Sequence, residues 1–282
     1  MEKLAILIHE RVQDNSWKPI QISRKGPSIS HLFSADDCLL FTKAKSTQVR
    51  LVTQILNDFG HALGLQVNLQ KTKFYTSRNI HCTKINKFRN IYIFSPTIDI
   101  DKYLGFPILI GKIKKADFKF IFDKLHSRLA GWKMSLISKA GRVVLASSIM
   151  NTIPNYIMHN LWLPQSVCDD IDKCIRTFIW GGHHKHWANW EVVTKSKKDG
   201  GLGIRPTKDV NTALLGKHVW DLIGEKQNLW TKSLESKYLK GEFVLRMRDY
   251  QGSSYTLQSI TKATKILEPG SIFRVGEGNL SI

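Results

Sequence analysis

The sequence predicts an α+β protein in which short strands and one helix come first and further helices follow. Apolar runs separated by polar turns dominate the first 110 residues, whereas apolar residues recur at helical spacing from residue 112 onward. Hydrophobic residues make up 42% and charged residues 23% of the 282-residue chain, which excludes wholesale disorder. We therefore expect three regions: an α/β region at 1–110, a basic helical region at 111–182 and a region with further helices at 183–282.

In the first region, residues 29–41 contain two apolar runs around a polar centre, which is the pattern of a hairpin. Residues 47–63 carry apolar side chains on one helical face, with Ser46 as a plausible N-cap and Gly64 as a C-terminal stop. Later segments look like short strands joined by polar turns: LQVNLQKTKFYTS at 65–77, NIYIF at 90–94 and KYLGFPI at 102–108.

The later regions are predicted to be mainly helical. A Ser166–Asp169 pair after Pro164 has the spacing of a capping box. The last stretch, 241–282, is weakly patterned, and its end looks like a cut rather than a finished domain. The expected helices lie at 118–129 before Gly131, at 138–153 before Pro154, from Pro164 to Gly181 and Gly182, and within 210–239.

The charge of the chain is strongly positive. Forty-two Lys and Arg oppose 23 Asp and Glu, for a formal charge of +19 and an isoelectric point near 9.8. With 13 Phe, 8 Trp and 7 Tyr beside these cations, the composition suits nucleic acid, whose phosphates attract cations and whose bases stack on aromatic rings. A ribosomal or membrane-surface protein would look similar on charge alone.

Targeting and cysteine patterns point to a reducing intracellular compartment, nuclear or cytoplasmic. Cys38, Cys82, Cys168 and Cys174 form no CxxC pair, so neither a disulfide-linked partner nor a zinc site is signalled. No apolar stretch reaches the roughly 18 residues of a membrane span, and no signal peptide is evident.

The densest basic helical stretch runs from residue 112 to residue 142. Nine Lys or Arg face two acids there, for a local charge of +7, and Trp132 lies among them. A charge run is usually a solvated helix face, but the global charge favours contacts with phosphates. The candidate nucleic-acid-binding residues are Lys112, Lys114, Lys115, Lys119, Lys124, Arg128, Lys133, Lys139 and Arg142.

Asp36 and Asp37 are adjacent carboxylates at the tip of the expected hairpin. A tight turn holds both side chains near one spot, where a divalent cation relieves their repulsion. A solvated turn is the competing interpretation. Two-metal phosphoryl transfer needs carboxylates from at least two chain segments, so this pair alone is not enough.

Several motifs together carry a resemblance. SHLFSADDCLLF resembles the Ala-Asp-Asp hairpin of the reverse transcriptases of plant LINE-type retrotransposons, and other segments resemble the same family in the same order. Ser34 stands where that family usually has an aromatic residue. The other matching segments are MEKL, WKPIQISRKGPSISHLF, GLQVNLQKTKFYTS, YLGFP, RLAGWKMSLISKAGRVVLASSIMNTIPNY, LPQSVCDDIDKCIRTFIWGG, HWANWEVVTKSKKDGGLGIR and FRVGEGNLSI.

The resemblance implies a fragment of an RNA-directed DNA polymerase, with a partial palm at 1–110 and a thumb and connection after it. It implies Asp36 and Asp37 as Mg²⁺ ligands and catalytic residues, and Lys71 near the departing pyrophosphate. The resemblance further implies Tyr103, Leu104 and Gly105 as a primer grip, and RNA or an RNA/DNA template-primer as the partner. The family's first palm Asp and its zinc-binding segment are missing here, so we expect no primer extension unless an upstream portion of the same polyprotein completes the site.

Other functional interpretations stay open. A noncatalytic nucleic-acid-binding module is the main alternative, and an unrelated basic structural protein is a weaker one. His183, His184 and His186 with Cys174 lack tetrahedral metal spacing, so a surface turn is the better interpretation. The glycines at 200, 201 and 203 lack the Lys-Ser/Thr of a P-loop, and a turn explains them.

Overall fold

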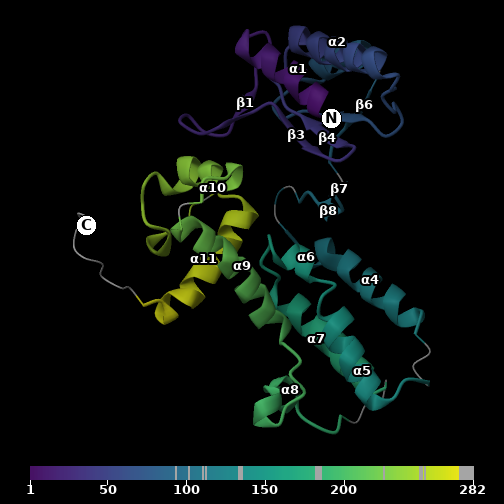
Figure 1. Ribbon diagram of the computed structural model, residues 1–282, viewed down its shortest axis with the longest axis vertical. Coiled ribbons are helices and arrows are strands. Elements are labelled where there is room, and N and C mark those ends of the chain that lie inside the picture. The colour runs from purple at the N-terminus through teal and green to yellow at the C-terminus, as the bar shows by residue number, and fades with distance from the viewer. Residues whose placement is uncertain are drawn as a thin grey trace. The chain divides into compact units, whose positions relative to one another are not determined.

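The computed structural model describes residues 1–92, 94–100, 102–109, 111, 113–132, 136–181, 186–224, 226–247, 250 and 252–272. The chain forms two compact units, residues 1–110 with 235–237, and residues 111–234 with 238–282 (Figure 1). Helices and short two-stranded sheets make up the described secondary structure, so the expected α+β class is confirmed. The finer division into three regions stays a prediction. None of the described helices is long and apolar enough to cross a membrane.

The first unit combines helices with four small sheets. The described sheets pair β1 with β2, β3 with β4, β5 with β6 and β7 with β8. Its elements are α1 (Glu2–Gln13), β1 (Ile20–Gln21), β2 (Ser28–Ile29), β3 (His31–Ser34), β4 (Asp37–Leu40), α2 (Ser46–Leu63), β5 (Lys73–Tyr75), α3 (Cys82–Tyr92), β6 (Ser95–Thr97), β7 (Lys102–Tyr103) and β8 (Phe106–Pro107).

Helix α2 has the apolar face that the sequence predicts. Val52, Ile55 and Phe59 are buried on that face and share one core with residues of α1. Ser46 is the first residue of the helix rather than its cap. Gly64 ends the helix with φ +66°, a left-handed conformation that glycine adopts at low cost.

Trp17 and Gln48 fix the loops of the first unit. Trp17 is 1% exposed, and its indole N–H donates to the Phe41 carbonyl over 3.0 Å. The amide of Gln48 donates to the Ser16 carbonyl over 2.7 Å, and its oxygen accepts from the Lys18 N–H over 2.7 Å. Buried polar groups require such partners, so these contacts hold the segment before β1 against α2.

The strands expected at 65–77 and 90–94 are largely wrong. Asn68 lies in a turn in which its side-chain oxygen accepts from the Lys71 N–H over 3.1 Å, and only Lys73–Tyr75 forms a strand. Residues 90–92 end α3, because Phe88 and Tyr92 continue a helical apolar spacing. Helix α3 connects β5 to β6, which pair in parallel, so this part of the chain is a βαβ unit.

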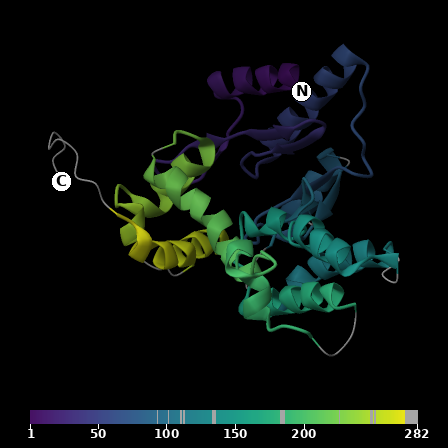
Figure 2. The ribbon, with the colours of Figure 1, turned by 60° about the horizontal axis from the view of Figure 1, so that its bottom comes forward.

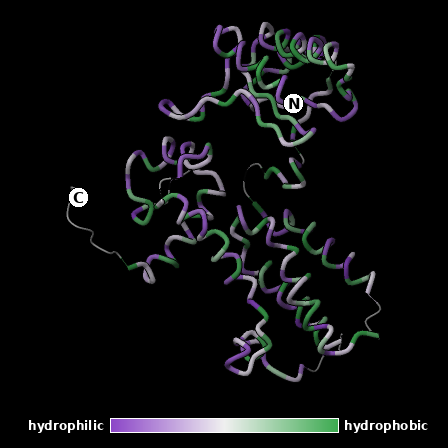
Figure 3. Tube along the Cα trace, viewed as in Figure 1, coloured by the Kyte–Doolittle hydropathy of each residue, from purple (hydrophilic) through white to green (hydrophobic). Residues whose placement is uncertain are grey.

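The second unit is helical in the part of the chain that the structure describes. Its polar and apolar residues alternate along the helices, as Figure 3 shows. The elements are η1 (Lys115–Phe118), α4 (Lys119–Ala130), α5 (Lys139–Leu145), η3 (Ala146–Met150), α6 (Asn155–Met158), α7 (Gln165–Ile179), α8 (Trp190–Thr194), η4 (Lys197–Asp199), α9 (Thr207–Ile223), α10 (Leu229–Leu234), η6 (Val244–Arg246), α11 (Tyr255–Leu267) and η7 (Glu268–Gly270). The π turn η5 (Glu235–Leu239) is divided, because its residues 235–237 group with the first unit.

Two helix boundaries in this unit differ from expectation. Ser138 caps α5 by accepting from the Gly141 N–H over 3.2 Å, but the helix passes into a π turn at 146–150. The capping box expected at Ser166 is wrong, because Ser166 lies inside α7. Asp169 instead accepts a hydrogen bond from the Gln165 side chain over 2.8 Å.

Helix α11 lies in the stretch that the sequence left weakly patterned. It packs beside α9, as both ribbon views show (Figures 1 and 2). Leu257 and Ile260 join Val219 and Leu222 of α9 in one buried cluster. A Cβ added at Gly216 of α9 would lie 2.7 Å from a methyl carbon of Leu267, so glycine permits the close approach of the two helices.

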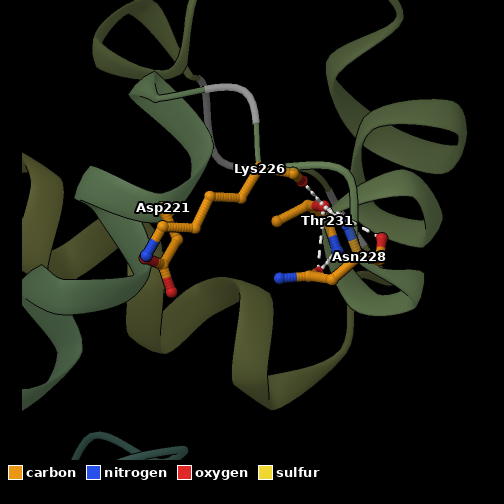
Figure 4. A network of polar contacts seen from close by, with 4 residues as sticks. All are labelled: Asp221, Lys226, Asn228 and Thr231. Atoms are coloured by element: carbon orange, nitrogen blue, oxygen red, sulfur yellow. Dashed lines mark hydrogen bonds and ion pairs between the residues drawn. The ribbon is translucent and has the colours of Figure 1, made fainter.

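Buried polar side chains fix the helix connections of the second unit. Figure 4 shows the connection from α9 to α10, where the Thr231 hydroxyl donates to the Lys226 carbonyl and the Thr231 N–H donates to Asn228 Oδ1 over 3.0 Å. Lys226 also forms an ion pair with Asp221. Thr231 is fully buried, so these bonds satisfy groups that water cannot reach.

Candidate nucleic-acid interface

The two adjacent carboxylates occupy the tip of an antiparallel hairpin. Strands β3 and β4 pair in the register Ser34↔Asp37, and Ala35 and Asp36 form the turn. Ala35 has φ +50°, which is uncommon for a residue with a Cβ. Asp36 and Asp37 are both exposed. The expected hairpin is therefore present, with its acids in solvent.

The acids of this hairpin do not fit a two-metal centre. Among the described residues, no group of three or more His, Cys, Asp or Glu side chains is placed to hold a metal ion. Two ions would need carboxylates from a second segment. Mg²⁺ at Asp36 and Asp37 stays a prediction from the sequence, and we derive no chemical step through it.

Lys71 and the YLGFP segment lie on segments other than the β3–β4 hairpin. Lys71 is exposed in the turn that Asn68 closes, and within the described residues it makes no ion pair with Asp36 or Asp37. Tyr103 lies in β7, while Leu104 and Gly105 turn the hairpin to β8 with φ +52° and +75°. The structure thus gives YLGFP a hairpin geometry, and its role as a primer grip stays a prediction.

The expected basic surface lies on η1, α4 and α5 of the second unit. Lys114, Lys115, Lys119, Lys124, Arg128 and Lys139 are exposed. Lys112 and Lys133 lie outside the described residues. In the described part of this surface, the one ion pair to a carboxylate joins Lys115 Nζ to Asp170 Oδ2 over 2.5 Å. Lys119, Lys124 and Arg128 therefore present their charge to solvent.

Two further predicted residues, Arg142 and Lys139, contact residues that follow α7 in the sequence. Arg142 is half-buried, and its guanidinium lies where a Cβ on Gly181 would be. The Lys139 ammonium lies 3.1 Å from the ring centre of Trp187, which is 74% exposed. Cation–π contacts of this kind are attractive, so an exposed aromatic ring and a cation share one surface here.

Trp132 is half-buried and packs against α7. Its ring centre lies 5.2 Å from that of Phe178, a buried residue of α7. Of the histidines considered with Cys174, His186 is exposed, and His183 and His184 lie outside the described residues. Burial raises the pKa of the Cys174 thiol, so this cysteine is protonated at neutral pH and is no activated nucleophile.

Sequence reasoning missed the residues of α7 that face α4. Phe122 and Leu129 of α4 and Lys173, Cys174 and Thr177 of α7 line one groove. The pairing of two helices far apart in sequence creates this groove, and the composition of α7, with three acids and two cations, gave no signal for it.

No family model matches the chain. A protein of Arabidopsis thaliana named "Putative ribonuclease H protein" is 39% identical over 140 residues, which cover 48% of this chain and 23% of that protein. An uncharacterized mitochondrial protein of the same plant is 28% identical over 131 residues, which cover 45% of this chain and 85% of that protein. The chain thus aligns with less than a quarter of the first relative's length.

The identification as a reverse transcriptase fragment is wrong by these comparisons. The relative with 39% identity is named as a ribonuclease H protein, and neither relative is named as a reverse transcriptase. The polymerase function, and the palm and thumb assigned with it, lose their support. What stands is a basic chain whose relatives are plant proteins, one of them named for a nuclease.

Proposed function

We propose that the second unit binds nucleic acid, with RNA as the first candidate, through the cations of η1, α4 and α5. The observation that carries the proposal is that Lys119, Lys124 and Arg128 are exposed and have no ion pair with a described carboxylate. A charge of +7 over residues 112–142 creates a positive potential that attracts polyanions. The word ribonuclease in one relative's name supports RNA over other polyanions.

We propose that the second unit binds nucleic acid, and we propose no cleavage of it. Nucleases that use two metals need several convergent carboxylates, and the described residues hold no such group. The free state of all four cysteines and the absence of a membrane-spanning helix among the described residues are compatible with an intracellular partner, nuclear or cytoplasmic. Tyr103, Leu104 and Gly105 belong to the first unit and stay predictions as contact residues.

The test is the salt dependence of binding to a labelled RNA oligonucleotide. Each phosphate neutralised adds about 0.7 to the slope of log affinity against log salt for a single strand. The double variant Lys124→Gln/Arg128→Gln should therefore flatten the slope by about 1.4 and weaken binding at low salt. Both residues are exposed, so the fold should persist.

The matched control removes the same charge from the first unit. Lys87 and Arg89 are exposed on α3, and the variant Lys87→Gln/Arg89→Gln should keep the slope of the wild type. Equal slopes for both double variants and the wild type would contradict the proposal. So would binding that does not respond to salt, because an apolar contact rather than phosphate contacts would then carry the affinity.

A further inference from the structure

A groove of about 690 Å³ opens between α4 and α7 in the second unit. This volume lies within the roughly 300–1,000 Å³ of typical ligand sites. Its lining is mainly apolar, and Phe122, Leu129 and Phe178 supply most of its large side chains. Phe122 is half-buried, so part of its ring faces the groove rather than the core. The site is thus shaped for a ligand with an apolar body.

Cations stand on both sides of this apolar lining. Lys119 extends from α4 and Lys173 from α7, and both are exposed and lack an ion pair with any described carboxylate. The acid of the lining, Asp170, is already paired with Lys115. The rims of the groove are therefore positively charged. Because Asp170 is paired, it adds little repulsion against an anionic ligand.

We propose that this groove receives unpaired bases of a single-stranded nucleic acid while its flanking lysines contact the phosphates. A base is flat and apolar on its faces, and its backbone carries an anion on each side, which matches the arrangement of lining and rims. A duplex hides the faces of its bases within the stack, so it cannot place them here. The inference rests on the proposed function and gives it a substrate class.

The surroundings of the groove favour a nucleotide over an acidic peptide helix. Lys124 and Arg128 are exposed on α4 outside the lining, and they add positive charge to the helix that forms one wall of the groove. An acidic amphipathic helix would fill the apolar part and leave those cations unused. The half-buried ring of Phe122 adds to this preference, because aromatic rings stack on bases of any sequence.

The experiment fills the groove without changing charge. Thr177 lines the groove from an exposed position on α7, so Thr177→Leu adds bulk there and spares the core. Ala213→Leu is the matched control, since Ala213 is exposed on α9 and outside the lining. Phe122→Ala removes the ring instead. Circular dichroism checks the folding of each variant.

The probes are a labelled oligo(dT) of about 16 nucleotides and its duplex with oligo(dA), at equal salt. We expect the wild type to bind the single strand roughly tenfold more tightly than the duplex, since stacking of a base on an aromatic ring is worth about that factor or more. Thr177→Leu and Phe122→Ala should each remove most of that preference, while the Ala213→Leu control keeps it.

The experiment distinguishes failure of the groove proposal from failure of the proposed function. Steeply salt-dependent binding of both probes with no preference for the single strand, or with a preference that Thr177→Leu leaves intact, would overturn the groove proposal and keep the proposed function. Binding of neither probe, nor of RNA, would overturn both. Loss of binding to an acidic amphipathic peptide in Thr177→Leu, with oligo(dT) binding unchanged, would assign the groove to a protein partner and overturn the inference.

Discussion

The first and second units both use buried polar side chains, but for different tasks. In the first unit, Trp17 and Gln48 tie loops to helix α2, and the described sheets have two strands each. In the second, Asn211 and Asp172 satisfy backbone groups at helix ends within a helical core. Two-stranded sheets are marginal by themselves, whereas capped helices form a rigid frame. The surface that we propose for binding lies on the unit whose helix ends are held by hydrogen bonds from Asn211 and Asp172.

The largest effect is expected for Trp17→Ala in the first unit. The indole is 1% exposed, and a buried Trp→Ala change costs about 3–5 kcal/mol of the free energy of unfolding. Hydrogen exchange should show faster exchange in α2 and unchanged exchange in α9. Trp220, which is 61% exposed, supplies the control, and Trp220→Ala should leave both helices protected. Equal loss of protection in α2 and α9 would contradict the expectation that the effect of Trp17→Ala is confined to the first unit.

A nearly equal effect is expected for Asn211→Leu in the second unit. Asn211 is 1% exposed, donates to the carbonyls of Met158 and Leu161 over 3.0 and 2.9 Å, and accepts from the Leu163 N–H over 2.8 Å. Each orphaned buried group costs about 1–3 kcal/mol, so we expect a loss of about 3 kcal/mol in urea denaturation.

The control for this change is Asn57→Leu on the exposed face of α2, with an expected effect within about 0.5 kcal/mol. An Asn211→Leu protein as stable as the control would mean that the apolar core, rather than the polar anchor, holds these helix ends.

Asp172 provides a smaller, pH-dependent test of the same anchoring. Its carboxylate accepts from the N–H and hydroxyl of Thr207, the first residue of α9, over 3.1 and 2.6 Å. Asp172→Ala should cost about 1–2 kcal/mol by removing this cap, whereas Asp172→Asn keeps an acceptor and should cost little.

Burial raises the pKa of Asp172 above its usual 3.8, despite the hydrogen bonds from Thr207. The folded state therefore holds this proton more tightly than the unfolded state does. The resulting stability is fully present below pH 3.8 and is lost as the pH rises through the raised pKa. In denaturation series, wild type should lose stability relative to Asp172→Asn as the pH rises through this window. A difference that stays constant with pH would contradict the shift.

The smallest effect is expected for Gly→Ala substitutions at the C-terminal ends of two helices. Gly64→Ala after α2 places a Cβ at φ +66° and should cost about 1 kcal/mol. Gly131→Ala after α4 should change stability by only a few tenths of a kcal/mol, because Gly131 is right-handed with φ −75°. Thermal denaturation of both variants checks this difference, and equal shifts would refute the conformational explanation.

The helices with a clear apolar face could be predicted from sequence, and elements that depend on tertiary pairing could not. Val52, Ile55 and Phe59 identified α2, and Gly64 identified its end. Residues 90–92 were misassigned because a short apolar run fits a strand and a helix end equally well. Helix α11 was missed because its buried face includes Ser259, Thr261 and Thr264, which look polar in sequence.

The candidate site was predictable only in its charge. The cations of residues 112–142 were evident from composition, and Lys114, Lys115, Lys119, Lys124, Arg128 and Lys139 are exposed, whereas Arg142 is half-buried. The groove between α4 and α7 was not, because it needs Phe122 and Thr177 to be brought together from separate helices. The hairpin at Asp36 and Asp37 was predictable from its two apolar runs, whereas a metal site there stays a prediction because the sequence supplies only two adjacent carboxylates.

Photo-crosslinking of the full chain to oligo(dT) that contains 4-thiothymidine, followed by mass spectrometry of the peptides, tests the central claim most directly. If the groove between α4 and α7 holds the bases, crosslinks will fall within residues 115–129 of η1 and α4 and within residues 170–178 of α7. The crosslinks in α7 should be lost in Thr177→Leu. Crosslinks confined to residues 1–110, at the Asp36 hairpin or at Tyr103, would contradict it, because the first unit would then carry the nucleic-acid contact.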